Sequence, residues 1–175
     1  MKKIIIFLLL LIAGNTFGQK IFSDTKDPFT NIRTVSTTLD PLYRVGFTNI
    51  LQVQTSITIQ NDSITSCNFA FIVPGLSYET EKIDSSLKDI CLLKDESGNI
   101  YTGKVTMSVS TTVLGSLYNS YACVFTKDDF SKLMNAKISD VKITTVRGKG
   151  GLFPIDKNRQ DNIAKQIKAV LKSFK

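Results

Sequence analysis

The sequence contains no histidine and no tryptophan, and it has only three cysteines in 175 residues. The absence of histidine excludes Ser-His-Asp and Cys-His catalysis and removes the commonest protein ligand of zinc, copper and non-haem iron. The cysteines, Cys67, Cys91 and Cys123, lie far apart and form no Cys-x-x-Cys pair, so neither a zinc knuckle nor a thioredoxin-type motif is present. The sequence therefore predicts no metal site, no cofactor and no catalytic residue.

Long apolar runs are also scarce, and the one that occurs lies near the amino terminus. Lys2 and Lys3 precede nine apolar residues at positions 4–12, and small and polar residues follow as far as Gly18. A run of this length is too short for a transmembrane helix and has the layout of a signal peptide over residues 1–18. No cysteine follows the run directly, so no lipid anchor is expected. We predict an exported protein, periplasmic or secreted, whose mature chain starts at Gln19 and has no transmembrane helix.

Blocks of like charge are absent as well. The net charge is +7, and removal of two lysines with the signal peptide leaves 20 basic residues against 15 acidic ones. This mild basic excess is spread along the chain, so we interpret it as a contribution to solubility and expect no nucleic-acid partner. The mature chain has the length of a single domain.

Each cysteine lies on a predicted strand face with apolar neighbours. Those neighbours are Phe69 and Phe71 for Cys67, Leu93 for Cys91, and Tyr121 and Phe125 for Cys123. These apolar neighbours indicate that the three cysteines are small side chains of the core. A disulfide between two of them is the alternative in an oxidising compartment.

Alternation of apolar and polar residues with a period of two dominates from residue 31 onward. Residues 51–59 predict a half-buried strand, and the turn at 61–63 joins it to a second strand at 66–73. Residues 89–94 and 100–111 predict another hairpin around 95–99, with Gly98 at positive φ. Further strands are predicted at 118–125 and 139–147, and a weaker pattern of the same kind occupies 31–39.

Two helices are predicted in the last third of the chain. Thr126 to Asp129 has the Thr-x-x-Asp form of a helix start and introduces a short helix. A longer helix over residues 156–174, capped by Asp156, carries an apolar stripe formed by Ile163, Ile167, Val170, Leu171 and Phe174. Lysines occupy the opposite side at positions 165, 168, 172 and 175, and Asp161 can pair with Lys165. Residues 76–88 fit either an irregular connection or a short helix.

These elements predict a mainly β (α+β) fold. We expect an antiparallel β-sandwich or a strongly curled sheet, with a short helix and a C-terminal amphipathic helix. An open single-layer arrangement is the alternative. Residues 19–30 are interpreted as a flexible leader, and residues 31–175 as a single β-rich domain ending in the helix at 156–174.

Several segments carry side chains that binding or catalysis can use, and each has a structural explanation. Residues 95–99 offer oxygen ligands for calcium but fit a hairpin turn, and residues 147–151 lack the phosphate-loop pattern. The acids Glu79, Glu81 and Asp84, and the pair Asp128-Asp129, are explained by solvation or helix capping. The polar series Thr106, Ser108, Ser110 and Thr112, opposite Val105, Met107 and Val109, fits the solvent face of a sheet. The sequence therefore assigns no site residue.

The signal peptide, the Asp27-Pro28-Phe29-Thr30 segment before the first predicted strand, and the closing order of helix, two strands and helix resemble small exported β-rich proteins of Gram-negative bacteria that have no assigned activity. This resemblance implies export and transfers no site residues. The leading hypothesis is a non-catalytic exported domain that binds a protein, a glycan or an envelope component. Two alternatives stay open: a hydrolase that uses carboxylates alone, and a domain that docks on anionic membranes through its C-terminal helix.

Overall fold

The computed structural model describes residues 20–74, 89–113, 116–144 and 151–174 of the chain. The described residues form ten strands: β1 (Ile21–Lys26), β2 (Arg33–Thr37), β3 (Asp40–Val45), β4 (Thr48–Gln60), β5 (Ser63–Pro74), β6 (Ile90–Asp95), β7 (Ile100–Val113), β8 (Ser116–Phe125), β9 (Ile138–Thr144) and β10 (Gly151–Pro154). Two α-helices, α2 (Lys127–Leu133) and α3 (Asn162–Phe174), and one short 3-10 turn, η1 (Lys157–Arg159), complete them. The predicted mainly β fold with a short helix and a C-terminal helix is confirmed.

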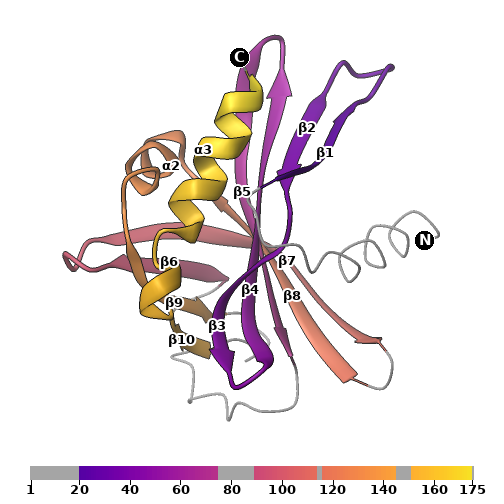
Figure 1. Cartoon of the computed structure of the whole chain (residues 1–175). Helices are drawn as coiled ribbons and strands as arrows, with labels where there is room; N and C mark the ends of the chain where they lie inside the picture. The colour runs from indigo at the N-terminus through magenta and orange to yellow at the C-terminus, as the bar shows by residue number, and fades with distance from the viewer. Residues whose placement is uncertain (1–19, 75–88, 114–115, 145–150, 175) are drawn as a thin grey trace.

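All ten strands belong to one antiparallel sheet. Their order is β1-β2-β4-β5-β8-β7-β6-β9-β10, and β3 pairs with the first part of β4 beside β2. The sheet is strongly curled and does not close into a barrel: in Figure 1, β6, β9 and β10 run at a steep angle to β4 and β5, and α3 lies across the inner side of this bend. The curled sheet, rather than two separate sheets, is therefore the form that the chain adopts.

The central hairpin follows directly from the alternation in the sequence. Leu51, Val53, Ile57 and Ile59 of β4 are buried on the inner face, as predicted. Asn61 and Asp62 both have positive φ, at 51° and 55°, which is the geometry of a two-residue type I′ turn. Gln60 pairs with Ser63 across this turn, and the register shifts by one residue between Ile59 and Thr58 before the two long strands continue.

Helix α3 closes the inner face of the sheet. The side chains of Ile163, Ile167 and Val170 are completely buried against β4 and β2, and Leu171 and Phe174 pack against the same core. The stripe predicted from the sequence is therefore part of the core. Lys165 forms the predicted ion pair with Asp161, with Nζ 2.6 Å from Oδ2.

Helix α2 begins as the Thr-x-x-Asp pattern predicts. The Oγ1 atom of Thr126 accepts a hydrogen bond from the Asp129 amide at 3.1 Å and donates one to Asp129 Oδ2 at 2.8 Å. Asp128 and Asp129 lie in the first turn, where acidic side chains favour the helix dipole. Phe130 and Leu133 then enter the core.

The start of the last helix differs from the prediction. The chain forms the 3-10 turn η1 after Asp156, and α3 begins only at Asn162. Asp156 makes no side-chain capping bond; its carboxylate lies 3.3 Å from Arg159 Nε instead. Its amide donates to Leu42 O of β3, which ties this segment to the sheet before the helix starts.

The segment interpreted as a flexible leader contains the edge strand β1. This strand pairs with β2 from Ile21 opposite Thr37 to Lys26 opposite Arg33, so the prediction of a leader over residues 19–30 is wrong for this part. The register shifts between Ile21 and Ser23. The rest of this edge strand, from Ser23 to Lys26, is polar and mostly exposed, which is why the sequence pattern did not indicate a strand.

A second register shift, between Val105 and Met107, corrects the prediction for β7. Val105 lies opposite Cys123 on the buried face, whereas Met107 lies opposite Ala122 on the other face. The three residues Val105, Met107 and Val109 therefore do not share a face. Met107 and Val109 are exposed instead, because the extra residue at the bulge places the side chains that follow it on the opposite face of the strand.

All three cysteines are free and buried, as their apolar neighbours predicted. Burial raises the pKa of Cys67, and burial together with the neighbouring Cys123 thiol raises the pKa of Cys91. Thiols of this kind are poor nucleophiles at neutral pH.

Several predictions fall outside the described residues. These are the signal peptide at 1–18, the ambiguous segment 76–88 with Glu79, Glu81 and Asp84, residues 145–150 of the glycine-rich segment, and Lys175. Within the described part of the chain, no helix has the length and apolar character needed to cross a membrane.

Candidate functional site

A cavity of about 460 Å³ lies at one end of the sheet. The β1–β2 loop, the β4–β5 turn and the last residues of α3 meet there, and Figure 1 shows these three segments at the same end of the molecule. We call it the end cavity. Its lining combines polar, charged and apolar side chains from positions far apart in the chain: Lys26, Asn31, Arg33, Ile59, Asn61, Asp62 and Phe174.

Three of the polar side chains are held by backbone turns. Asn31, Asn61 and Asp62 all have left-handed backbone conformations, with φ between 51° and 55°. Asparagine and aspartate tolerate this conformation better than other residues with side chains. In the β1–β2 loop, Asp27 Oδ1 accepts hydrogen bonds from the amides of Phe29 and Thr30, and the Asn31 amide donates to Asp27 O at 3.0 Å. These turns fix the backbone positions from which the three exposed side chains project.

Arg33 is fixed by hydrogen bonds on two sides. Its Nε and Nη2 atoms donate to the two carboxylate oxygens of Asp24 at 2.8 and 2.6 Å, and Nη2 also donates to Ser173 O at the end of α3. The hydrogen bond from the guanidinium holds the pKa of Asp24 below its usual value. Arg33 therefore links the edge hairpin to the helix and forms a rigid part of the cavity wall.

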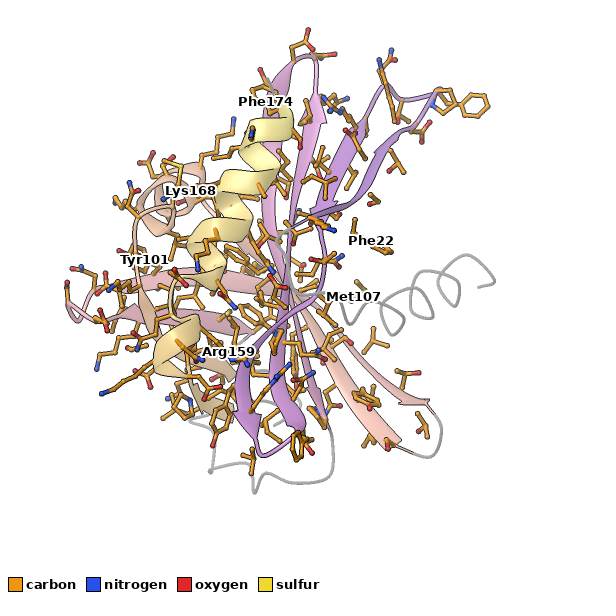
Figure 2. The ribbon with its side chains drawn as sticks, in the orientation of Figure 1. Phe22, Tyr101, Met107, Arg159, Lys168 and Phe174 are labelled. Carbon is orange, nitrogen blue, oxygen red and sulfur yellow. The ribbon has the colours of Figure 1, made fainter. Side chains whose placement is uncertain are left out.

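Ile59 and Phe174 form the apolar part of the lining. Ile59 is a buried residue of the core, and Phe174 is half-buried against that core at the last described position of the chain. Figure 2 shows Phe174 at the end of α3. An aromatic side chain thus borders a cavity whose other walls are mostly polar.

The charges around the end cavity balance. Lys26 and Arg33 supply two positive charges, and Asp24 and Asp62 supply two negative ones. The carbonyl end of α3, which carries partial negative charge, also lies here. The cavity accordingly has no strong preference for a ligand of either sign.

A second cavity, of about 360 Å³, lies beside the β6–β7 turn and is lined by Asp95, Glu96, Ser97, Tyr101, Lys132, Asn135, Ala136 and Lys137. Asp95 is engaged within the protein: it accepts hydrogen bonds from the Asn99 amide, Asn99 Nδ2 and Tyr101 OH at 2.8 to 3.0 Å. Burial alone would raise the pKa of Asp95, but these bonds and one from the Ser97 amide outweigh it and lower the pKa. Gly98 has φ of 87°, so residues 95–99 form the predicted hairpin turn.

A buried polar network lies between α3 and the sheet. Gln166, which is fully buried, donates through Nε2 to Asp40 Oδ2 at 2.8 Å and to Val53 O at 3.1 Å, and its Oε1 accepts from Thr55 Oγ1 at 2.7 Å. Burial raises the pKa of Asp40, although the Gln166 hydrogen bond and the charges of Arg159 and Lys165 act in the opposite direction. This network opens into neither of the two cavities, so we assign it a role in docking the helix.

The raised pKa of Asp40 predicts a pH-dependent effect of Asp40→Asn. A carboxyl group whose folded-state pKa lies above its unfolded value loses stabilisation as pH rises through that interval. The neutral amide retains an acceptor for Gln166 without a buried charge, so we expect Asp40→Asn to raise the melting temperature at pH 7. Below the usual aspartate pKa of about 3.9, the gain should shrink, because Asp40 is then protonated in both states. Thermal unfolding of both proteins at pH 7 and at a pH below about 3.9 measures this difference. An equal or larger gain in melting temperature at the acid pH would contradict the prediction.

Six carboxylates of the described residues are engaged within the protein. Asp24, Asp40, Asp95, Asp129, Asp156 and Asp161 each have a hydrogen-bond or ion-pair partner in the structure. The described residues also contain no group of three or more acidic or cysteine side chains suited to holding a metal ion. Thr106, Ser108, Ser110 and Thr112 are each exposed, but the prediction that they form one face opposite Val105 is wrong: after the bulge, Ser108 lies opposite Tyr121, on the same face as Val105.

Apolar side chains are also exposed on the described surface. Met107 and Val109 lie on the side of the sheet away from α3, where Figure 2 also shows Phe22. Phe29 and Phe47, at the tips of the β1–β2 loop and the β3–β4 turn, are almost fully exposed. Single exposed apolar residues are common on protein surfaces and do not by themselves define a site.

Comparison with known proteins returned no relative. No family model, no curated protein and no solved structure matches the chain. The functional argument therefore depends on the residues and geometry described above.

Proposed function

We propose that the protein is an exported, non-catalytic binding domain, which acts in the periplasm or outside the cell. The observation that carries this proposal is the end cavity, in which three separate segments bring hydrogen-bonding side chains together with an apolar wall. Its volume lies within the range of roughly 300 to 1,000 Å³ that is usual for small-ligand sites. The layout of residues 1–18 supports export.

The composition of the end cavity favours binding over hydrolysis. Hydrolysis of a glycosidic bond commonly needs two carboxyl groups at a fixed separation on either side of the bond. Among the described residues of the lining, Asp62 is the one carboxylate, and Asp24 behind Arg33 is held by that guanidinium. The cavity thus offers groups that can hold a ligand and lacks the acid pair for this kind of cleavage.

The test uses the mature protein, recovered from the exported fraction and shown by intact mass to begin at Gln19. It is mixed with peptidoglycan fragments, solubilised envelope polysaccharide and envelope protein extract in separate samples. Ligand at about 100 times its Kd stabilises the folded state by about 2.7 kcal/mol, so we expect one sample to raise the melting temperature by about 5 to 10 °C. Reducing ends are measured in the same samples and should not increase. Release of reducing ends, or an unchanged melting temperature in all samples, would contradict the proposal.

A further inference from the structure

We propose that the end cavity binds a neutral saccharide, with a sugar ring against Phe174 and its hydroxyls bonded to Asn31, Asn61 and Asp62. This inference depends on the proposed function, because it names the ligand class of the same site.

The aromatic wall suits one face of a sugar ring. Pyranose rings present an apolar face of C–H groups, and aromatic side chains bury such faces while leaving the ring edges free for hydrogen bonds. Phe174 supplies an aromatic ring at the cavity, and Ile59 adds apolar surface from the end of β4. The rest of the lining is polar, so an entirely apolar ligand would leave these groups without partners.

The polar side chains suit hydroxyl groups. Each sugar hydroxyl both donates and accepts, and an asparagine side chain offers two donors and a carbonyl acceptor in one plane. Asn31 and Asn61 place two such amides on the cavity, from different loops, and Asp62 adds two acceptor oxygens. Adjacent hydroxyls of one ring can therefore be held from two sides.

The backbone of the two loops and the Arg33 side chain are also held in place before a ligand arrives. Asn61 and Asp62 occupy the two central positions of a tight hairpin turn, the Asn31 loop is closed by hydrogen bonds to Asp27, and Arg33 is held by Asp24 and Ser173. Groups that are ordered in the free protein lose less conformational entropy on binding. Weakly binding ligands such as sugars benefit most from this saving.

The charges select a neutral ligand over an acidic one. The two positive groups, Lys26 and Arg33, are matched by Asp62 and Asp24, and the end of α3 presents carbonyl oxygens on the same side. Because Asp24 already pairs with Arg33, and Asp62 opposes Lys26 in charge, an acidic sugar would gain little net attraction. A neutral saccharide makes the same hydrogen bonds without this opposition.

Isothermal titration calorimetry on the mature protein tests the inference. The probes are three neutral trisaccharides, maltotriose, cellotriose and chitotriose, with trigalacturonic acid as the acidic counterpart. We expect at least one neutral probe to bind with Kd of about 1 mM or tighter, and the acidic probe to bind at least about tenfold more weakly.

Two variants connect any binding to the end cavity. Phe174→Leu keeps an apolar contact with the core but removes the aromatic face, and Asn61→Gly removes the amide while suiting the positive φ of the turn. Each should weaken binding of the neutral probe about tenfold or more. Phe29→Ala changes a fully exposed ring in the adjacent loop that does not line the cavity, and it should leave Kd unchanged.

The outcomes separate this inference from the function on which it depends. If no neutral trisaccharide binds, or if both cavity variants bind as well as the parent protein, the saccharide site is wrong. The broader function survives that result where an envelope fraction still raises the melting temperature. Cleavage of a trisaccharide during the titration would overturn both.

Discussion

Replacing Ile167 with aspartate should destabilise the protein by about 4 kcal/mol or more, a large part of the 5 to 15 kcal/mol that typically holds a domain folded. The Ile167 side chain is completely buried between α3 and the sheet. The substitution both removes apolar contacts and places a carboxyl group where no water can solvate it. Thermal or urea unfolding of the purified variant measures the loss.

Lys168→Glu is the matched control, since it changes a charge on the next residue of the same helix. Lys168 is exposed on the side of α3 that faces solvent, so its substitution should change stability by about 0.5 kcal/mol or less. An unchanged melting temperature for Ile167→Asp would contradict the assignment of the stripe to the core. Sedimentation with anionic vesicles would then show whether the stripe binds membranes instead.

Gly103→Ala should cost about 1 to 3 kcal/mol, because this glycine leaves room for the ring of Phe125. A Cβ atom at position 103 would lie 2.6 Å from Cζ of Phe125 and equally close to neighbouring ring atoms. The ring is buried and packs edge-on against Phe69, with 5.2 Å between ring centroids, so it cannot move aside freely. Unfolding experiments on the variant measure the cost, and Gly103→Val should be still more destabilising.

A double-mutant cycle separates this clash from other effects of the substitution. Phe125→Leu removes the ring and is itself destabilising, but it opens space above residue 103. In that background, adding Gly103→Ala should cost much less than it does in the parent protein. An equal cost in both backgrounds would mean that contact with Phe125 is not the reason for glycine at this position.

The regular strands were predictable because their alternation is uninterrupted. β4 and β5 each keep one face apolar over most of their length, and the turn residues Asn61 and Asp62 identify their connection. The α3 stripe was predictable for the same reason at helical spacing. Prediction failed in two places: β1 is a mostly polar edge strand that contains a bulge and no alternation, and a second bulge moves Met107 and Val109 to the opposite face of β7. A bulge adds one residue to the count along the strand, and no residue type in either segment indicates where it falls.

The end cavity could not be predicted from sequence patterns, for a different reason. It combines residues from the β1–β2 loop, the β4–β5 turn and the end of α3, which are separated by up to 148 positions between Lys26 and Phe174. The sequence indicated a turn at Asn61 and Asp62 and a core stripe that includes Phe174. It carried no signal that these two features meet, because their contact depends on how α3 crosses the curled sheet.

The large sequence separation between α3 and the strands that it covers also determines when this protein can finish folding. Gln166 bonds to Thr55, Asp40 and Thr38, at separations of 111 to 128 residues, so the first strands lack their covering layer until the last helix has been delivered. Contacts of such high sequence separation form slowly and late. A chain that emerges from a translocation pore amino terminus first would spend this interval with β2, β3 and β4 exposing apolar side chains to solvent. Such an intermediate is prone to aggregation, which makes completion of the carboxyl end the step that protects the whole sheet.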